Sequence, residues 1–296
     1  MSPAPPFTVR AGRRAVPITH PEKVLFPRDG ITKADLARYF ADIAPAMVPH
    51  TRRRPVAMHV FPGGIDGRGH YAKNVPSHFP DWIPRATLDK RGGTITHVLA
   101  DDAATLVYLA GQNVVTIHVW PSRAEAPRQP DRVIFDLDPG DVPFTEVRAA
   151  AREVGDAVRD AGLVPYAMTS GSRGIHVVAP VKPGPEFPAV FRWAKGVGDE
   201  LAARHPQWLT TEFYKEKRGA PIFVDTRRNA YAQHAVAPYS PRPRDGAPVA
   251  TPLHWEELED RRLRPDSWSI ATVVERVREG GDPWKGIDRR RRSLRA

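Results

Sequence analysis

The chain has 296 residues, of which 41% are hydrophobic, no cysteine and a formal net charge of +10 at pH 7. This composition is typical of a folded protein with a sizeable core, and it excludes disulfides, cysteine nucleophiles and cysteine-held metal sites. No apolar run reaches the ~20 residues of a membrane span and the first residues lack a secretory signal, so we expect a cytoplasmic protein without membrane contact. The positive charge favours a polyanionic partner.

The first part of the chain contains one clear helix pattern. Residues 1–18 are rich in proline and arginine, and we expect them to form a loosely ordered arm. In the next segment, Thr32 and Asp35 match a capping box near the start of a helix over residues 31–47. The apolar residues of this helix recur at helical spacing and predict one buried face, made of Leu36, Tyr39, Phe40, Ile43 and Met47.

Strands and a long irregular segment follow this helix. Residues 54–62 alternate between apolar and polar and predict a strand. Residues 63–84 show no regular pattern, and loops of such length in a compact domain are commonly functional. The pattern then predicts another strand, a short helix near residues 102–112 and a strand over residues 114–121.

The second half mixes helices and strands without strict alternation. Residues 126–130 are expected to form a linker, and residues 289–296 a basic tail. Between them we expect a strand that begins near residue 133, helices over 145–161, 188–204 and 270–280, and strands over 163–170, 175–181, 208–214 and 220–225. This order favours an α+β fold with mixed or antiparallel sheets flanked by helices. We expect an N-terminal α/β part over residues 19–125 and a second part over residues 126–288.

Two acids stand one residue apart in the segment VIFDLDPGD, residues 133–141. In a strand, Asp136 and Asp138 project on the same face, opposite to the neighbouring apolar side chains. Such acids raise each other's pKa unless a positive group lies between them, and a divalent cation such as Mg²⁺ or Mn²⁺ is the usual one. The open alternatives are a strand end that faces water and a phosphatase in which one aspartate is the nucleophile.

Two further segments add phosphate-binding and metal-binding groups. The segment TSGSRGIHVVAP, residues 169–180, contains a Ser/Gly turn with Arg173, whose backbone N–H groups and guanidinium suit a phosphate. A hairpin with an exposed arginine is the alternative. Asp225 ends another apolar strand. Three carboxylates near a phosphate-binding turn favour two-metal nucleotidyl transfer.

The order of these motifs resembles a known family. FDLDPG, then SGSRGIHV, then VD followed by VAPYSPR and GAPVATPLHWEEL, is similar to the polymerase domain of bacterial ligase D, in the archaeo-eukaryotic primase superfamily. The front segment HPEKVLFP with GITKADLARYF resembles the same family. The resemblance covers about residues 19–288 and implies a primase-polymerase-like catalytic core.

The resemblance also implies roles for individual residues. It makes Asp136, Asp138 and Asp225 the ligands of two Mn²⁺ or Mg²⁺ ions. It assigns the nucleotide to Ser170, Ser172, Arg173, His176, His118 and Arg242, a DNA 5′-phosphate to Lys23 and Lys33, and template stacking to Tyr71, beside His70. Lys33 falls in the first helical turn, where N–H groups and the helix dipole favour anions. Two positions depart from the family pattern: members carry lysine at Arg173 and often an aromatic at Thr226.

The function implied by the resemblance is a DNA-repair polymerase that adds ribonucleotides or deoxynucleotides at gaps or broken ends. Its expected partners are DNA with a 5′-phosphate, NTP or dNTP, Ku and a separate DNA ligase. We expect a stand-alone polymerase that is associated with the nucleoid. The alternatives are a DNA-end-binding factor with weak catalysis and an aspartate-dependent phosphatase.

Overall fold

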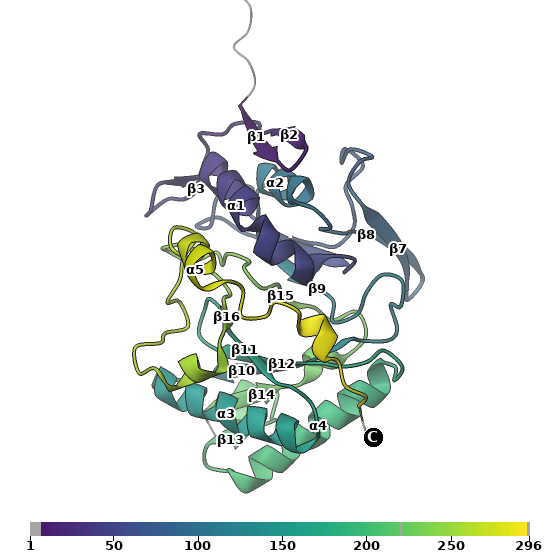
Figure 1. Cartoon of the computed structure of the whole chain (residues 1–296), viewed down its shortest axis with the longest axis vertical. Helices are drawn as coiled ribbons and strands as arrows, with labels where there is room; N and C mark the ends of the chain where they lie inside the picture. Colours follow the sequence, from purple (N-terminus) through teal and green to yellow (C-terminus); the bar gives the residue numbers. More distant parts are fainter. Residues whose placement is uncertain (1–6, 220, 295–296) are drawn as a thin grey trace, which may run out of the picture. The chain divides into compact units, whose positions relative to one another are not determined.

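The structure is a computed structural model that describes residues 7–219 and 221–294. The chain forms two compact units (Figure 1). Unit 1 contains the described residues up to Val119 together with Val236–Val249 and Trp268–Gly280, and unit 2 contains Trp120–Ala235, Ala250–Ser267 and the residues from Gly281 onwards. The predicted boundary at residue 125 lies close to the first crossing, but the later return of two segments to unit 1 was not predicted. The mixed α+β class is confirmed.

Unit 1 is built around a four-stranded sheet and two packed helices. The sheet has the order β15 (Ala235–Val236), β9 (Val114–Val119), β5 (Val56–Val60) and β6 (His70–Ala72). Helices α1 (Lys33–Thr51) and α2 (Ala103–Gly111) pack against each other, and α5 (Val273–Gly280) also contacts α1. The unit also contains the hairpins of β3 (Val24–Phe26) with β4 (Ile31–Thr32) and of β7 (Arg85–Lys90) with β8 (Gly93–Val98).

The predicted N-terminal arm is an ordered hairpin over its described part. Strands β1 (Thr8–Ala11) and β2 (Arg14–Pro17) pair antiparallel. The side chains of Val9, Val16 and Ile18 are buried in the core of unit 1. The expectation of a loose arm is therefore wrong for residues 7–18, because alternating apolar side chains hold this segment on the core; residues 1–6 lie outside the described residues.

Helix α1 begins where the capping box predicts. The Thr32 hydroxyl accepts a hydrogen bond from the Asp35 amide, and the Asp35 carboxylate accepts one from the Thr32 amide. The predicted apolar face is buried, and the helix continues through Pro45 to Thr51. The long segment 63–84 contains only the short strand β6, which pairs with β5.

Unit 2 contains a six-stranded sheet with β10 near its centre. Its order is β13 (Leu209–Thr210), β14 (Ile222–Asp225), β10 (Arg132–Pro139), β12 (Ile175–Pro180), β11 (Tyr166–Thr169) and β16 (Pro252–Leu253). Strand β10 pairs antiparallel with both β12 and β14. The predicted helices are present as α3 (Phe144–Asp160) and α4 (Phe187–Arg204), and one-turn helices occur at η1 (Lys215–Lys217), η2 (Arg227–Asn229), η3 (Trp255–Glu259) and η4 (Ile287–Arg290).

Helices α3 and α4 pack on β10 and on each other, and they lie together on one side of the sheet in Figure 1. The odd-numbered residues of β10 face them: Val133, Phe135 and Leu137 are fully buried, and the ring of Phe135 contacts Trp193 of α4. Because side chains alternate along a strand, Asp136 and Asp138 project from the opposite, helix-free face. The sheet thereby separates an apolar core from a polar face.

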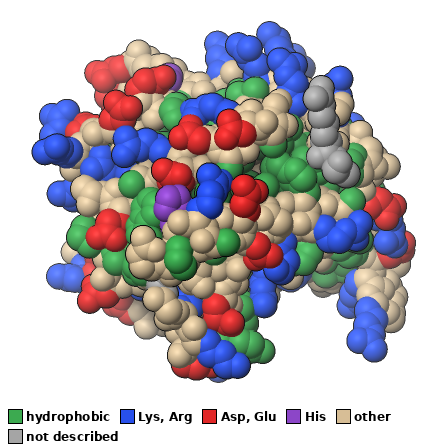
Figure 2. Space-filling view, turned by 90° about the horizontal axis from the view of Figure 1, so that it is seen from below, with side chains coloured by type: hydrophobic (Ala, Val, Ile, Leu, Met, Phe, Trp, Pro, Cys, Tyr) green, Lys and Arg blue, Asp and Glu red, His purple; other side chains and the backbone are tan. Residues whose placement is uncertain are grey.

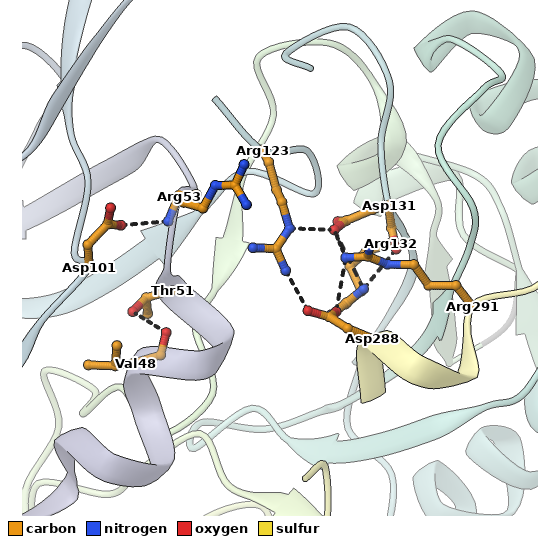
Figure 3. Close-up of polar contacts among 9 residues, drawn as sticks. All are labelled: Val48, Thr51, Arg53, Asp101, Arg123, Asp131, Arg132, Asp288 and Arg291. Atoms are coloured by element: carbon orange, nitrogen blue, oxygen red, sulfur yellow. Dashed lines mark hydrogen bonds and ion pairs between the residues drawn. The ribbon is translucent and has the colours of Figure 1, made fainter. Parts of the chain in front are cut away.

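The predicted basic tail is partly held on unit 2 by a cluster of ionic side chains (Figure 3). Arg123 contacts Asp131 at 3.0 Å and Asp288 at 2.6 Å. Arg132 also contacts Asp288, and Arg291 contacts Asp131 at 2.6 Å. The start of the basic tail is therefore held on unit 2, because Asp131 and Asp288 both contact Arg291; residues 295–296 lie outside the described residues.

Within the described part of the chain, no helix is both long enough and apolar enough to cross a lipid bilayer. On the face drawn in Figure 2, lysine and arginine side chains are interspersed with acidic ones. The net positive charge of the chain is therefore not concentrated in one basic patch on this face.

Candidate active site

The register of the sheet in unit 2 brings the predicted acids together. Asp136 lies directly opposite Asp225 in the β10–β14 pair and opposite His176 in the β10–β12 pair. Residues directly opposite each other in antiparallel strands project on the same face. Asp138, two residues further along β10, shares this face. The register of three neighbouring strands thus places these acids on one face of the sheet.

Asp136 is held between a histidine and an arginine side chain. Its Oδ1 atom lies 3.2 Å from His176 Nε2, and its Oδ2 atom accepts a hydrogen bond from Arg228 Nε at 3.2 Å. Burial disfavours the carboxylate, but the His176 imidazole and then the Arg228 guanidinium outweigh it and hold the pKa of Asp136 well below its ordinary value. The side chain is therefore a carboxylate at neutral pH.

Asp225 has a different environment although it faces Asp136. Burial raises the pKa of Asp225, and the Asp136 charge adds to this, while Arg228 opposes the rise. Arg228 Nη2 lies 3.5 Å from Asp225 Oδ2, and the Arg227 amide donates to Asp225 Oδ1 at 2.8 Å. One guanidinium therefore bridges the two facing acids, which is the positive group that their proximity demands.

Asp138 lies at the outer end of this row of acids. Arg173 Nη2 is 3.4 Å from its Oδ1 atom, and Arg218 Nη1 is 3.9 Å from its Oδ2 atom. The Arg173 side chain is 56% exposed, whereas that of Arg218 is 14% exposed. Arg173 is therefore the more accessible charge for a ligand.

The turn between β11 and β12 is organised by Ser170. Its hydroxyl oxygen accepts hydrogen bonds from the amides of Ser172, Arg173 and Gly174 at 3.3, 3.3 and 3.0 Å. These amides, which the sequence predicts to face a phosphate, are thus bonded within the turn. The side chains of Ser172 and Arg173 remain the candidate phosphate contacts, and Ser170 has a shaping role.

Gly174 has a steric reason to be glycine. A Cβ atom at this position would lie 2.0 Å from the carbonyl oxygen of Leu137 on β10. Any side chain would push the turn away from the strand that carries Asp136 and Asp138. Gly174 therefore keeps Arg173 close to the acids.

Arg228 is a site residue that sequence reasoning missed. It lies on η2, and the next residue, Asn229, fastens this turn to β10: its amide oxygen accepts from Ile134 N at 2.8 Å and its amide nitrogen donates to Ile134 O at 2.7 Å. Asn229 is fully buried. The sequence places Arg228 three residues after Asp225, which could have indicated a role in the site. It does not show that Asp225 pairs with the strand that carries Asp136.

The donors of this face suit a hard divalent cation. Carboxylate oxygens are the ligands that Mg²⁺ and Mn²⁺ prefer. Within residues 7–219 and 221–294, no group of three or more His, Asp and Glu side chains is already arranged to hold a metal ion. Each of the three acids is instead paired with an arginine, as the contacts above show. The donor chemistry fits metal ions, and the present arrangement is one in which arginines neutralise the acids.

A pocket opens beside the outer acid. It has a volume of about 380 Å³ and is lined by Asp138, Pro139, Gly140, Arg173, Lys215, Arg218, Gly219 and Pro221. The lining combines one carboxylate with three basic side chains, which suits a ligand that carries several negative charges.

The other predicted nucleotide and template residues belong to unit 1. The Tyr71 ring stacks on His59 with centroids 4.2 Å apart and packs edge-on against His118 at 5.3 Å. Burial, then the charges of Arg242 and His70, lower the pKa of His59 to about 4. His118, Arg242 and Tyr71 therefore gather around His59, a neutral histidine that the sequence did not single out.

Lys23 and Lys33 also lie together in unit 1. The Lys33 amide donates to the Lys23 carbonyl at 2.8 Å, and burial, then the Lys23 charge, lower the pKa of Lys33. Lys33 Nζ donates to Thr19 O at 3.0 Å, and Lys23 Nζ donates to Pro62 O. The expected free N–H groups at the helix start are largely occupied, since the Ala34 amide also donates to a carbonyl, that of Pro21.

Comparisons with known proteins agree with this geometry. The family described as LigD, primase-polymerase domain, matches residues 32–284. The chain is 34% identical over 287 residues to the multifunctional non-homologous end joining DNA repair protein LigD of Mycobacterium tuberculosis, covering 94% of this chain and 38% of that protein. It is 26% identical over 265 residues to the bifunctional non-homologous end joining protein LigD of Bacillus subtilis, covering 89% of this chain and 42% of that protein.

The chain thus spans about two fifths of the length of these relatives. Among solved structures it is similar to the polymerase domain from Mycobacterium tuberculosis ligase D in complex with DNA, with a TM-score of 0.88 and 34% identity. That alignment covers 93% of this chain and 98% of the solved domain. The matches in sequence and fold, on a sheet that unites the three acids, show that the chain belongs to the LigD primase-polymerase domain family.

Proposed function

We propose that this chain is a DNA-repair polymerase of the primase-polymerase type that adds nucleotides to a 3′ end at gaps or broken ends. The observation that carries the proposal is the β10–β14 register, which places Asp136 opposite Asp225 with Asp138 on the same face. Membership of the family supports it, because its relatives are non-homologous end joining proteins and its solved relative is a polymerase domain in complex with DNA.

The family is metal-dependent, and we propose Asp136, Asp138 and Asp225 as the residues that would hold two Mn²⁺ or Mg²⁺ ions. Ions bound there would supply the charge that activates the primer 3′-hydroxyl and stabilises the leaving pyrophosphate. For its own part, the chain must free its carboxylates, since Arg228 bridges Asp136 and Asp225 in the structure. We propose that Arg228 swings away when the site is loaded.

The polypeptide's remaining task is to hold the nucleotide. Arg173 is exposed beside Asp138, and its charge suits a triphosphate oxygen. His176 is buried and keeps Asp136 in place through Nε2, while its Nδ1 atom is buried without a hydrogen-bond partner among the described residues. We propose that Nδ1 forms a hydrogen bond with the nucleotide, together with Ser172. His118 and Arg242, which belong to unit 1, are proposed as nucleotide contacts on the family resemblance alone.

A DNA 5′-phosphate is proposed to bind at Lys23 and Lys33. Each ammonium already donates to a carbonyl, and the two lysines are joined through their backbones. Because the amides of the helix start are occupied, the lysine side chains alone must supply the positive charge. Tyr71 is half exposed on its His59 support and is proposed to stack on a template base.

The phosphate assignment is tested by DNA binding at one fixed salt concentration, because salt alone shifts such affinities strongly. Wild-type protein is expected to bind a gap with a 5′-phosphate about tenfold more tightly than one with a 5′-hydroxyl, since each charge-assisted contact contributes roughly 1.5–3 kcal/mol. Lys23→Ala with Lys33→Ala should erase the difference. Equal wild-type affinity for both gaps would remove the lysine pocket from the proposal.

The reaction is tested by extension of a 5′-phosphorylated gapped duplex with Mn²⁺ or Mg²⁺ and with ribonucleotides and deoxynucleotides in turn. Extension by the wild type supports a polymerase. Tight binding of the gap without extension would instead support the end-binding alternative. Release of inorganic phosphate without extension would support the phosphatase alternative.

A further inference from the structure

The segment between β13 and β14 presents two adjacent aromatic rings to solvent. Phe213 is 43% exposed and Tyr214 is 54% exposed. Their ring centroids are 5.4 Å apart at an interplanar angle of 78°. Single exposed apolar residues are common, but two neighbouring exposed aromatics on one loop form a surface with a specific geometry. Nothing in the mechanism described above uses these rings.

Basic side chains lie directly against both rings. The Arg227 guanidinium is 3.6 Å from the Phe213 ring centroid, and the Lys217 ammonium is 5.2 Å from that of Tyr214. Such contacts hold a ring in place and bring a positive charge over one of its faces, which leaves the other face for a base. Aromatic rings interleaved with lysine and arginine are the features by which proteins bind single-stranded nucleic acid without reading its sequence. Glu212, which immediately precedes the two rings in the sequence, accepts a hydrogen bond from the Tyr214 amide at 2.9 Å.

The same segment forms a wall of the pocket beside the catalytic acids. Lys215, Arg218 and Gly219 line that pocket together with Asp138. Arg218 is mostly buried, lies 4.1 Å from the Phe223 ring centroid and reaches towards Asp138. The segment is thus anchored at Arg218 and exposes its rings a few residues before this anchor. A strand that passes the pocket would meet lysines and then the two rings.

We propose that Phe213 and Tyr214 form a stacking surface for unpaired bases of a DNA strand that enters the catalytic pocket, with Lys215 and Lys217 facing its phosphates. This inference rests on the proposed function, because a polymerase that acts at gaps or broken ends meets DNA with an exposed single strand. The Arg227 contact fixes Phe213, and Arg218 fixes the segment relative to Asp138. The surface is independent of the proposed template contact at Tyr71, which belongs to unit 1.

The test measures binding of full-length protein to a duplex with a single-stranded overhang, in chelator so that metal plays no part. Two DNAs are compared, one with an ordinary overhang and one whose overhang has abasic sites. The variants are Phe213→Leu with Tyr214→Leu, which removes both rings, and Tyr214→Phe, which keeps them. Tyr71→Leu is the comparison variant, because it removes the ring of the separately proposed template contact in unit 1. Thermal unfolding of each variant checks that it is folded.

We expect wild-type protein to bind the ordinary overhang at least tenfold more tightly than the abasic one, because stacking on an aromatic typically changes affinity by this factor or more. The double leucine variant should lose about tenfold on the ordinary overhang and little on the abasic one. Tyr214→Phe should behave as wild type. If the double variant keeps the full difference while Tyr71→Leu removes it, the stacking surface is overturned. If wild-type protein binds neither DNA, the proposed function itself fails.

Discussion

At the scale of single residues, the acids of the site are not equivalent. Asp136 has a lowered pKa because His176 and Arg228 outweigh the effect of burial, whereas burial raises the pKa of Asp225. A lowered pKa means that the folded protein favours the carboxylate; this stabilisation is complete above the ordinary value of 3.8 and is lost as the pH falls through the lower folded value. A raised pKa means that ionisation of Asp225 at neutral pH costs stability.

We therefore predict opposite effects of two matched substitutions on the free energy of unfolding, measured with urea at pH 7 in chelator. Asp136→Asn should lower it by on the order of 1–3 kcal/mol, since charged hydrogen bonds are lost. Asp225→Asn should leave it unchanged or raise it, because asparagine keeps the acceptor for the Arg227 amide and removes the buried charge. Equal losses in both variants would show that the environments of the two acids are the same.

Arg228 is expected to compete with metal for the two facing acids. Its guanidinium lies between Asp136 and Asp225, so Arg228→Gln should lower the Tm in chelator and increase the Tm shift produced by Mn²⁺. The gain in Mn²⁺ affinity should be about tenfold, the effect of one charge-assisted contact. Arg227→Gln is the comparison variant, since that side chain contacts Phe213 and its charge acts on Asp225 more weakly than that of Arg228. Similar Mn²⁺ shifts in all three proteins would contradict competition.

At the scale of elements, the approach of the Ser170–Gly174 turn to β10 depends on Gly174. Gly174→Ala would place a Cβ atom 2.0 Å from Leu137 O, so strand and turn must separate. We predict a loss of more than about 2 kcal/mol in the free energy of unfolding, as expected for overpacking against backbone. The control is Gly196→Ala in α4, where nothing lies within 4 Å and alanine should stabilise by up to about 1 kcal/mol. A mild effect at Gly174 would mean that the turn can move freely.

The C-terminal segment should depend on Asp288, to which Arg132, Arg123 and Arg291 all reach. Burial raises the pKa of Asp288, but these arginines outweigh it and lower it below 3.8. Asp288→Asn should therefore reduce stability at pH 7, and the difference from wild type should shrink as the pH falls below about 4. Glu200→Gln, in an exposed ion pair with Arg204, should change stability by less than about 0.5 kcal/mol. A pH-independent loss in Asp288→Asn would exclude the charge as its cause.

These elements also show what sequence reasoning can reach. Helices α3 and α4 match the predicted spans 145–161 and 188–204 almost to the residue, because periodicity is a local signal. The pairing of β14 with β10, which creates the Asp136–Asp225 contact, joins residues about ninety positions apart. No local pattern encodes that register, so the role of Arg228 was missed. His59 was missed because its contacts with Tyr71 and His118 join separate strands of unit 1.

At the scale of the whole molecule, charge and domain division were only partly predictable. The chain has a net charge of +10, but some of its arginines form ion pairs within the protein, as in the cluster around Asp131 and Asp288. These arginines are therefore less available to a polyanionic partner. The boundary near residue 120 follows from a proline-rich connection, whereas the return of Val236–Val249 and Trp268–Gly280 to unit 1 follows from long-range packing. The ordered hairpin of residues 8–17 has the same origin, since its few apolar side chains are buried on that core.

The central claim is nucleotide addition by the acids of β10 and β14. The most direct measurement is extension of a 5′-phosphorylated gapped duplex with Mn²⁺ by wild-type protein, Asp136→Asn and Asp225→Asn at equal concentrations, each first shown to be folded. We predict extension by the wild type and a loss of at least about a hundredfold in both variants, because removal of a metal ligand costs several kcal/mol of transition-state stabilisation. Extension by either variant within about tenfold of wild type would contradict the assignment of these acids to the reaction.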